Sequence, residues 1–198
     1  MDDNSVNEAV KRLFALLKTR QVDFLLVGGI AVLSYVEGRN TEDLDLIVAL
    51  PALKKMPEIK LTAQEQFFGR GNFEDLKIDL LLTTNPVFAK VIQTYATLRS
   101  FHEQEVPTAT VEGLVLLKLY ALSSLYRQGD FGRVSLYEND LAVLIYQYNP
   151  DLEALLRELS PYVTGGDMEE IQHILVEIQQ RIVRFKKKTN SSKESTNP

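Results

Sequence analysis

The stretch Thr41-Glu42-Asp43-Leu44-Asp45-Leu46-Ile47-Val48 decides the fold of this 198-residue chain. Acidic and apolar residues alternate first, and the stretch then stays apolar until Pro51, which predicts a β-strand over residues 43–50. Residues two apart on a strand face the same side, so Asp43 and Asp45 point together with their Cα atoms about 7 Å apart. The leucines of the stretch face the core.

Two carboxylates in a mostly apolar strand favour a bound metal ion. They repel each other and each loses hydration, and a divalent cation relieves both costs. An all-oxygen ligand set at this spacing favours Mg²⁺ or Mn²⁺ over zinc. The alternative is that the acids are strand-end residues that face solvent, because an isolated Asp-x-Asp is a weak motif.

A third acid, Asp79, lies in the apolar stretch Leu76-Lys77-Ile78-Asp79-Leu80-Leu81-Leu82, which predicts another buried strand. If this strand lies beside that of Asp43 and Asp45, three carboxylates converge in the outline of a two-metal site. One metal would hold a triphosphate. The other would activate an attacking hydroxyl, with Asp79 bridging to it or acting as a base.

A glycine pair, Gly28-Gly29, stands between an apolar run at residues 24–27 and a helix predicted over residues 30–36. Glycines after a strand and before a helix allow close backbone approach and expose N–H groups that bind phosphate. The alternative is a plain strand-to-helix turn. As candidate nucleotide-binding residues, Gly28 and Gly29 add a phosphate site to the metal site.

The first half of the chain is predicted to be a mixed α/β module. Helical spacing of apolar residues indicates a helix over residues 6–19, and the run at residues 24–27 indicates a buried strand. A strand at residues 66–68 is followed by turn residues, Gly69-Arg70-Gly71-Asn72. A helix over residues 86–92 has Asn85 as its N-cap, and residues 97–110 are ambiguous between strand and loop.

From residue 111 onward only helices are predicted, over residues 111–126, 134–146, 152–159 and 168–185. The last residues are polar and lack apolar periodicity, which indicates disorder. The expected fold class is therefore α+β. An α/β-type module with a mixed sheet occupies residues 1–110, a helical module residues 111–186 and a disordered tail residues 187–198.

Composition sets the class of protein. The net charge of −5 gives no overall attraction to nucleic acid or to an anionic membrane. There is no cysteine, which excludes disulfides and thiolate chemistry. Without an apolar run of the roughly 18–20 residues that span a bilayer, and without a signal-peptide pattern, we expect a cytoplasmic protein that has no membrane partner.

Together these elements resemble the DNA polymerase β-like nucleotidyltransferase superfamily. Its pattern is an apolar residue, Gly-Gly or Gly-Ser, a short spacer, and Asp-apolar-Asp. Here Val27-Gly28-Gly29 is followed after thirteen residues by Asp43-Leu44-Asp45, and Asp79 matches the later strand carboxylate. The resemblance covers the first half of the chain and implies a nucleotidyltransferase palm with a mixed sheet.

Within that superfamily, Arg39-Asn40-Thr41-Glu42-Asp43-Leu44-Asp45 looks like the abortive-infection toxin type, which is called AbiEii-like. Such proteins also carry a lysine on a later helix and a downstream acidic element, which Lys118 and Asp140 match. Asp140 follows Glu138-Asn139, where an Arg-Asp or Lys-Asp pair is more usual, so its role stays open. Arg39 and Thr41 flank the metal acids and would touch phosphate, and a solvated turn is the alternative for Arg39.

Lys118 has a physical case of its own. It is the only charged residue between Glu112 and Arg127, in a strongly apolar helix. An unpaired ammonium is costly to bury, so Lys118 needs an anion, and a triphosphate or an active-site carboxylate would serve. The alternative is a lysine whose stem is buried and whose ammonium reaches solvent.

The resemblance implies transfer of a nucleoside monophosphate from an NTP to an acceptor hydroxyl, with release of pyrophosphate, by a two-metal mechanism. The acceptor would be a tRNA, a protein or a small molecule. The toxin-type motif favours a macromolecule, in a toxin–antitoxin or phage-defence system with a cognate partner, whereas the acidic net charge disfavours a large RNA surface. The alternative is a non-catalytic nucleotide-binding or antitoxin-like interaction module, against which the presence of all three carboxylates argues.

Overall fold

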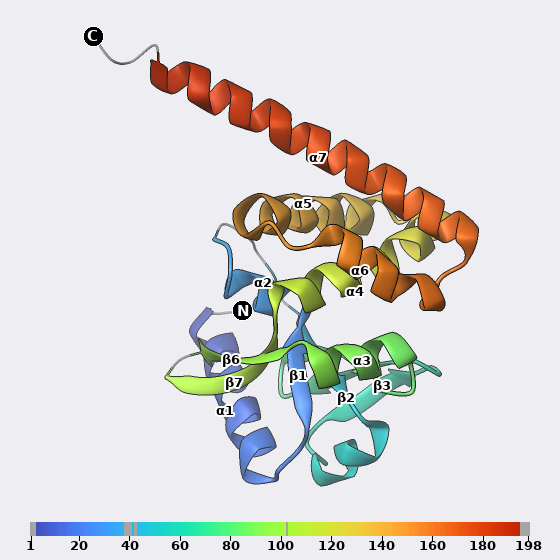
Figure 1. Cartoon of the computed structure of the whole chain (residues 1–198). Coiled ribbons are helices and arrows are strands. Elements are labelled where there is room, and N and C mark those ends of the chain that lie inside the picture. The colour runs from blue at the N-terminus through green and yellow to red at the C-terminus, as the bar shows by residue number, and fades with distance from the viewer. Residues whose placement is uncertain (1–2, 38–40, 42, 102, 195–198) are drawn as a thin grey trace. The chain divides into compact units, whose positions relative to one another are not determined.

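The computed structural model describes residues 3–37, 41, 43–101 and 103–194, and the chain divides into two compact units, Met1–Leu117 and Lys118–Pro198 (Figure 1). The boundary falls inside helix α4 (Val111–Gln128) and not at its start, where the change of sequence pattern places it. The reason is that the first turns of α4 pack with the sheet unit.

The first unit is built on a mixed sheet in the order β3-β4-β5-β2-β1-β7-β6. The strands are β1 (Phe24–Val27), β2 (Leu44–Val48), β3 (Lys60–Gln64), β4 (Phe68–Phe73), β5 (Leu76–Leu82), β6 (Ala96–Phe101) and β7 (Gln104–Ala109). β2 is parallel to β5 and β1 is parallel to β7, whereas the other neighbours are antiparallel. The predicted α+β class with a mixed sheet is confirmed.

Helices pack on both faces of this sheet. They are α1 (Asp3–Thr19), α2 (Gly28–Leu33), α3 (Pro86–Thr94) and a 3₁₀ turn, η1 (Leu50–Lys55). Phe14 of α1 stacks on Phe24 with ring centroids 6.0 Å apart, and Phe88 of α3 meets Phe68 edge-on at 5.4 Å. Phe24 and Phe68 lie in adjacent rows of the register, so their side chains point to opposite faces.

Two elements of the first unit differ from the sequence prediction. The stretch Gly69-Arg70-Gly71-Asn72, predicted as a turn, is the middle of strand β4, and β3 was not predicted. Along β4 exposed and buried residues alternate, and both glycines lie on the buried side, where a Cβ on Gly71 would stand 2.9 Å from the Lys60 carbonyl oxygen. Glycine here permits close strand packing. The local sequence alone does not distinguish such a glycine from one in a turn.

The second unit contains helices only, among the residues that the structure describes. Its elements are the greater part of α4, α5 (Phe131–Tyr148), α6 (Leu152–Leu159), a 3₁₀ turn η2 (Ser160–Tyr162) and α7 (Gly165–Glu194). α5 and α7 pack against each other. Their buried side chains include Leu141 and Leu144 on α5 and Ile171 and Ile178 on α7.

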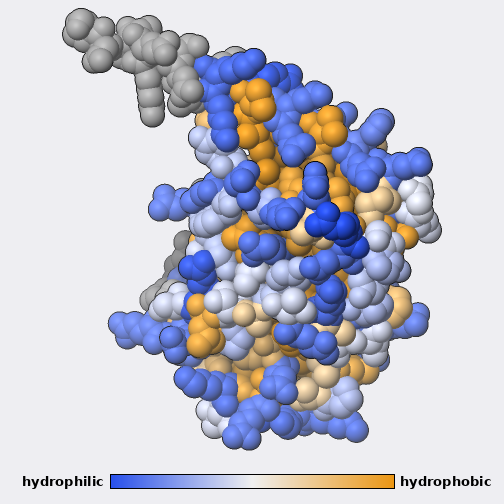
Figure 2. Space-filling model, in the orientation of Figure 1, coloured by the Kyte–Doolittle hydropathy of each residue, from blue (hydrophilic) through white to orange (hydrophobic). Residues whose placement is uncertain are grey.

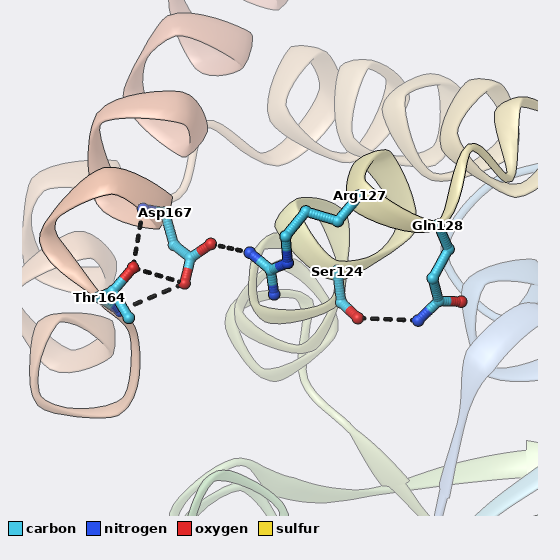
Figure 3. Close-up of polar contacts among 5 residues, drawn as sticks. All are labelled: Ser124, Arg127, Gln128, Thr164 and Asp167. Carbon is cyan, nitrogen blue, oxygen red and sulfur yellow. Dashed lines mark hydrogen bonds and ion pairs between the residues drawn. The ribbon is translucent and has the colours of Figure 1, made fainter.

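Helix α7 begins with a reciprocal cap and ends later than predicted. The Thr164 hydroxyl accepts a hydrogen bond from the Asp167 N–H (3.2 Å) and donates one to Asp167 Oδ2 (2.8 Å), and Arg127 also pairs with Asp167 (Figure 3). The backbone is helical through Glu194 and thus runs into the segment 187–198, for which disorder stays a prediction. Neither glycine nor proline occurs between Gly166 and Pro198 to end the helix.

Apolar side chains remain exposed along α7. Figure 2 shows hydrophobic residues between hydrophilic ones on the upper part of the face in view. The exposed apolar residues of α7 include Val176, Val183 and Phe185. Within the described ranges, every helix is too short or too polar to cross a lipid bilayer.

Candidate active site

One row of the sheet carries the charged side chains. The register aligns Val27 of β1 with Asp45 of β2, Asp45 with Asp79 of β5, and Asp79 with Arg70 of β4. Aligned residues share a face of the sheet. The next row on this face is apolar and lies under α3, so the charged row stands where the apolar cover ends.

Asp45 and Asp79 are therefore direct neighbours on parallel strands. Adjacent strands lie about 4.8 Å apart, which brings the two carboxylates side by side. The strand adjacency on which the candidate site depends is present in the structure. Asp45 is half-buried and the Asp79 side chain is 34% exposed, so both carboxylates are partly accessible to solvent.

Gly28 lies directly against the Asp45 carboxylate. A Cβ built on Gly28 would overlap the carboxyl group of Asp45, and the backbone φ of Gly28 is +64°, a conformation that residues with a side chain rarely adopt. Glycine is thus required at position 28 for two independent reasons. The close approach that the Gly28-Gly29 pair predicts is present, and its partner is Asp45.

The same turn opens helix α2. Gly28 and Gly29 are its first two residues, and Val27, the residue before them, provides no side-chain cap. The first N–H groups of a helix have no partner within the helix. These groups therefore stand next to Asp45, at the end of strand β1.

The other residues predicted to flank the acids are placed less closely. Asp43 is exposed and immediately precedes β2, and the Thr41 hydroxyl donates a marginal 3.5 Å hydrogen bond to the Asp43 carbonyl oxygen. Thr41 thus supports the backbone that enters the strand. Arg39 lies outside the described residues.

Arg70 is a member of the charged row that the sequence prediction missed. Its Nε lies 3.5 Å from Asp79 Oδ1, and its side chain is 62% exposed. The signal that would have found it is the alternation of Phe68, Arg70 and Asn72 with glycines, which fits a strand as well as a turn. Arg70 supplies a positive charge beside the carboxylates.

Lys118 and Asp140, predicted separately, form one buried pair in the second unit. Lys118 Nζ donates to Asp140 Oδ2 at 2.7 Å and stands 4.2 Å from the centre of the Tyr137 ring. Their side chains are 4% and 6% exposed. The anion that Lys118 needs is thus supplied by helix α5, and its contact with a nucleotide stays a prediction.

The donor set can be tested against the predicted metal. Asp45 and Asp79 offer carboxylate oxygens at one level of the sheet, which suits Mg²⁺ or Mn²⁺. Among the described residues, no three aspartate, glutamate or histidine side chains gather as a metal-holding group. The pair Asp45–Asp79 offers oxygen donors of the kind that a divalent cation prefers, and the role of Asp43 as a further metal ligand stays a prediction.

Comparisons with known proteins support the fold. The sequence matches no family profile and no curated protein. Three solved structures align well along most of the chain. An antigenic nucleotidyltransferase-like protein from Paracoccidioides brasiliensis is 16% identical with a TM-score of 0.54, and the match covers 85% of this chain and 92% of that one.

The other two structures are of the antibiotic-resistance factor ANT(2″)-Ia. In complex with adenylyl-2″-tobramycin it is 11% identical with a TM-score of 0.55, covering 88% of this chain and 97% of that chain. In solution it is 14% identical with a TM-score of 0.51, covering 82% and 100%. At such identities the similarity concerns the fold, and this chain shares the fold of nucleotidyltransferase-like structures.

Proposed function

We propose that this chain is a nucleotidyltransferase that moves a nucleoside monophosphate from an NTP to a hydroxyl of an acceptor. One observation carries the proposal: Asp45 and Asp79 are register neighbours on parallel strands, and Asp45 lies against the glycine turn that opens α2. The turn supplies backbone N–H groups and the strands supply carboxylates. A phosphate site beside a carboxylate pair suits phosphoryl transfer better than it suits general hydrolysis.

Each residue has a role in the proposed reaction. The Gly28-Gly29 turn binds phosphate oxygens of the NTP through its N–H groups. Asp45, with Asp43, would hold Mg²⁺ or Mn²⁺, and the bound cation would neutralise charge on the phosphates. Asp79 accepts the proton of the acceptor hydroxyl. The acceptor oxygen then bonds to the α-phosphorus, the bond to the β-phosphate bridge breaks, and pyrophosphate leaves.

Two classes of acceptor have support. The AbiEii-like motif rests on the sequence and favours a macromolecule, a tRNA or a protein, in a toxin–antitoxin or phage-defence setting. The ANT(2″)-Ia structure with adenylyl-2″-tobramycin shows that a protein of this fold holds an adenylylated small molecule. The test must therefore include both classes of acceptor, and a cell lysate supplies both.

The test is label transfer. Purified protein is incubated with Mg²⁺ or Mn²⁺, each α-³²P-labelled NTP and a cell lysate, and the labelled fraction is identified by nuclease and protease treatment. We expect Asp45→Asn and Asp79→Asn each to reduce label transfer by about a thousandfold, since charge stabilisation at the reacting phosphate is lost. Removal of the divalent cation with EDTA should have the same effect.

Asp23→Asn is the matched control. Asp23 is exposed and immediately precedes β1, at the end of the strand opposite to Val27 and Gly28. The variant makes the same change of charge outside the row and should transfer label as the unmodified chain does. Full activity in Asp45→Asn would disprove the proposed site, and metal-dependent NTP binding without any transfer would favour the non-catalytic module.

A further inference from the structure

Three cations share the sheet face that carries Asp79. Strands β3, β4 and β5 contain four charged residues, Lys60, Arg70, Lys77 and Asp79. In the ladder, Asn72 of β4 lies between Lys60 and Lys77, and Arg70 lies opposite Asp79. Aligned residues, and residues two apart on one strand, share a face. All four side chains thus lie on one face, and we call Lys60, Arg70 and Lys77 the basic strip.

The basic strip is accessible and poorly neutralised. Lys60 and Lys77 are exposed, and Arg70 is 62% exposed. Within the described part of the chain, its single ion pair is the 3.5 Å contact of Arg70 with Asp79. Diagonal neighbours such as Arg70 and Lys77 stand about 7–8 Å apart, and like charges at this distance repel. An anion that binds between them is stabilised by all three.

The backbone beneath the basic strip is irregular and closely packed. A β-bulge in β3, between Leu61 and Ala63, lies opposite Gly71 and Arg70. At Gly71 the strands approach so closely that a Cβ would stand 2.9 Å from the Lys60 carbonyl oxygen. Bulges re-aim side chains and concentrate near functional sites. The strip thus lies beside a local irregularity of β3 and a close approach of β3 to β4.

The position of the strip within the sheet indicates which substrate of the proposed reaction lies next to it. Across the strands the order is Gly28 after β1, then Asp45 on β2, Asp79 on β5 and Arg70 on β4. In the proposed function, the NTP phosphates bind at the Gly28 turn and Asp79 accepts the proton of the acceptor. The basic strip therefore lies on the acceptor side of Asp79.

We propose that the basic strip binds a phosphate group of the acceptor, so that the acceptor is a phosphate-bearing compound, a mononucleotide or the end of a polynucleotide. This inference rests on the proposed function, which supplies the reaction centre. The planar fork of an arginine and two ammonium groups suit phosphate oxygens. The acceptor phosphate lies on the strip, and its hydroxyl points to Asp79.

The test measures binding of a short 5′-fluorescein-labelled RNA by fluorescence anisotropy. The double variant Lys60→Gln/Lys77→Gln leaves Arg70 and Asp79 in place. We expect its RNA affinity to fall about tenfold and the salt dependence of binding to become shallower, because two phosphate contacts are lost. Lys54→Gln is the matched control: Lys54 is exposed and lies after the end of β2 opposite to Asp45, and its loss should leave affinity unchanged.

Competition with AMP separates the two sources of phosphate. AMP that displaces the RNA at similar concentrations indicates a mononucleotide acceptor, and failure of AMP to compete indicates a polynucleotide end. Either result supports the inference if the double variant is impaired. The inference is overturned if the double variant binds the RNA as tightly as the unmodified chain does. It is also overturned if the unmodified chain binds the cationic probe tobramycin more tightly than it binds the RNA.

A second readout separates this inference from the proposed function. Magnesium-dependent NTP binding, measured by calorimetry, should be the same in the double variant and the unmodified chain. If the unmodified chain binds no NTP, the proposed function fails whatever the strip binds. If both proteins bind NTP and RNA equally, only the basic strip loses its role.

Discussion

One ion pair in each compact unit joins residues that the sequence singles out or the charged row contains, and the two pairs differ sharply in burial. In the first unit Arg70 and Asp79 stand 3.5 Å apart with side chains 62% and 34% exposed. In the second, Lys118 and Asp140 stand 2.7 Å apart with side chains 4% and 6% exposed. An exposed pair contributes about 0–1 kcal/mol, whereas removing one partner of a buried pair costs about 3–5 kcal/mol. A ligand can replace the contact of Arg70 with Asp79 at little cost, whereas the pair Lys118–Asp140 joins α4 to α5.

The largest effect on stability is expected from Lys118→Met. Methionine fills a similar volume but leaves the Asp140 carboxylate buried without its ammonium partner. We expect the free energy of unfolding to fall by about 3–5 kcal/mol, measured by urea denaturation followed by far-ultraviolet circular dichroism. Arg70→Gln, which breaks the exposed pair, should cost less than about 1 kcal/mol.

The double variant Lys118→Met/Asp140→Leu tests the cause. When both charges are replaced by apolar groups, the desolvation cost disappears together with the pair. We expect most of the lost stability to return. A double variant as unstable as Lys118→Met alone would mean that packing around Tyr137, and not the unpaired charge, accounts for the loss.

The next effect, from Gly28→Ala, concerns the open site. The substitution imposes the left-handed conformation on alanine, which costs about 1–2 kcal/mol, and its methyl group overlaps the Asp45 carboxylate. We expect a total loss of about 2–4 kcal/mol in urea denaturation, together with loss of the label transfer that we propose.

Gly129→Ala provides the matched comparison from the other unit. Gly129 has almost the same φ, +68° against +64°, but apart from its chain neighbours no described residue has a heavy atom within 4 Å of a Cβ placed there. This variant should show the conformational cost alone and retain label transfer. Equal losses of stability and activity in the two variants would show that the contact of Gly28 with Asp45 has no consequence.

Local signals in the sequence pointed to part of the candidate site. Asp43 and Asp45 follow from strand periodicity, and Gly28 follows from the strand-to-helix transition. Which strands are neighbours depends on packing between distant segments, so the alignment of Asp45 with Asp79 was a condition in the sequence argument and a fact only in the structure.

Arg70 and the partner of Lys118 escaped prediction for different reasons. Glycines beside Arg70 are typical of turns, and only the close approach of β3 explains why they occur in a strand. Lys118 was correctly expected to need an anion, because its helix is apolar. The anion proved to be Asp140, 22 residues later on α5, a pairing that depends on how two helices pack.

A smaller effect is expected from Asp167→Ala at the start of α7. Asp167 accepts from the N–H and hydroxyl of Thr164, and these hydrogen bonds, with Arg127, lower the pKa of its carboxyl (Figure 3). Loss of the cap should cost about 1–2 kcal/mol at neutral pH. A lowered pKa gives stability that is present above the unfolded pKa of about 3.9 and is lost as pH falls through the folded value.

Asp167→Asn separates the charge from the cap. Asparagine keeps an accepting oxygen but does not titrate. The difference in stability between the unmodified chain and this variant should therefore narrow as pH falls below about 4. Thermal unfolding across that pH range measures this difference. A gap that stays constant with pH would show that the charge of Asp167 has no part in holding α7.

The smallest effect, from Tyr126→Phe, tests the second unit at alkaline pH. Burial and the hydrogen bond that Tyr126 donates to Glu138 raise the pKa of the phenol. The neutral phenol is thus favoured in the folded chain, which gives stability that is fully present below the unfolded pKa of about 10 and is lost as pH rises through the folded value.

Phenylalanine keeps the ring and loses the hydrogen bond, so the variant should be about 1 kcal/mol less stable at neutral pH. That gap should close above about pH 10 in urea denaturation, because only the unmodified chain must then deprotonate a half-buried phenol beside a carboxylate. A gap that stays constant as pH rises would mean that the phenol has the same pKa in the folded and unfolded chain, as it would with its oxygen in water, and would leave Lys118–Asp140 as the buried polar contact that distinguishes the second unit.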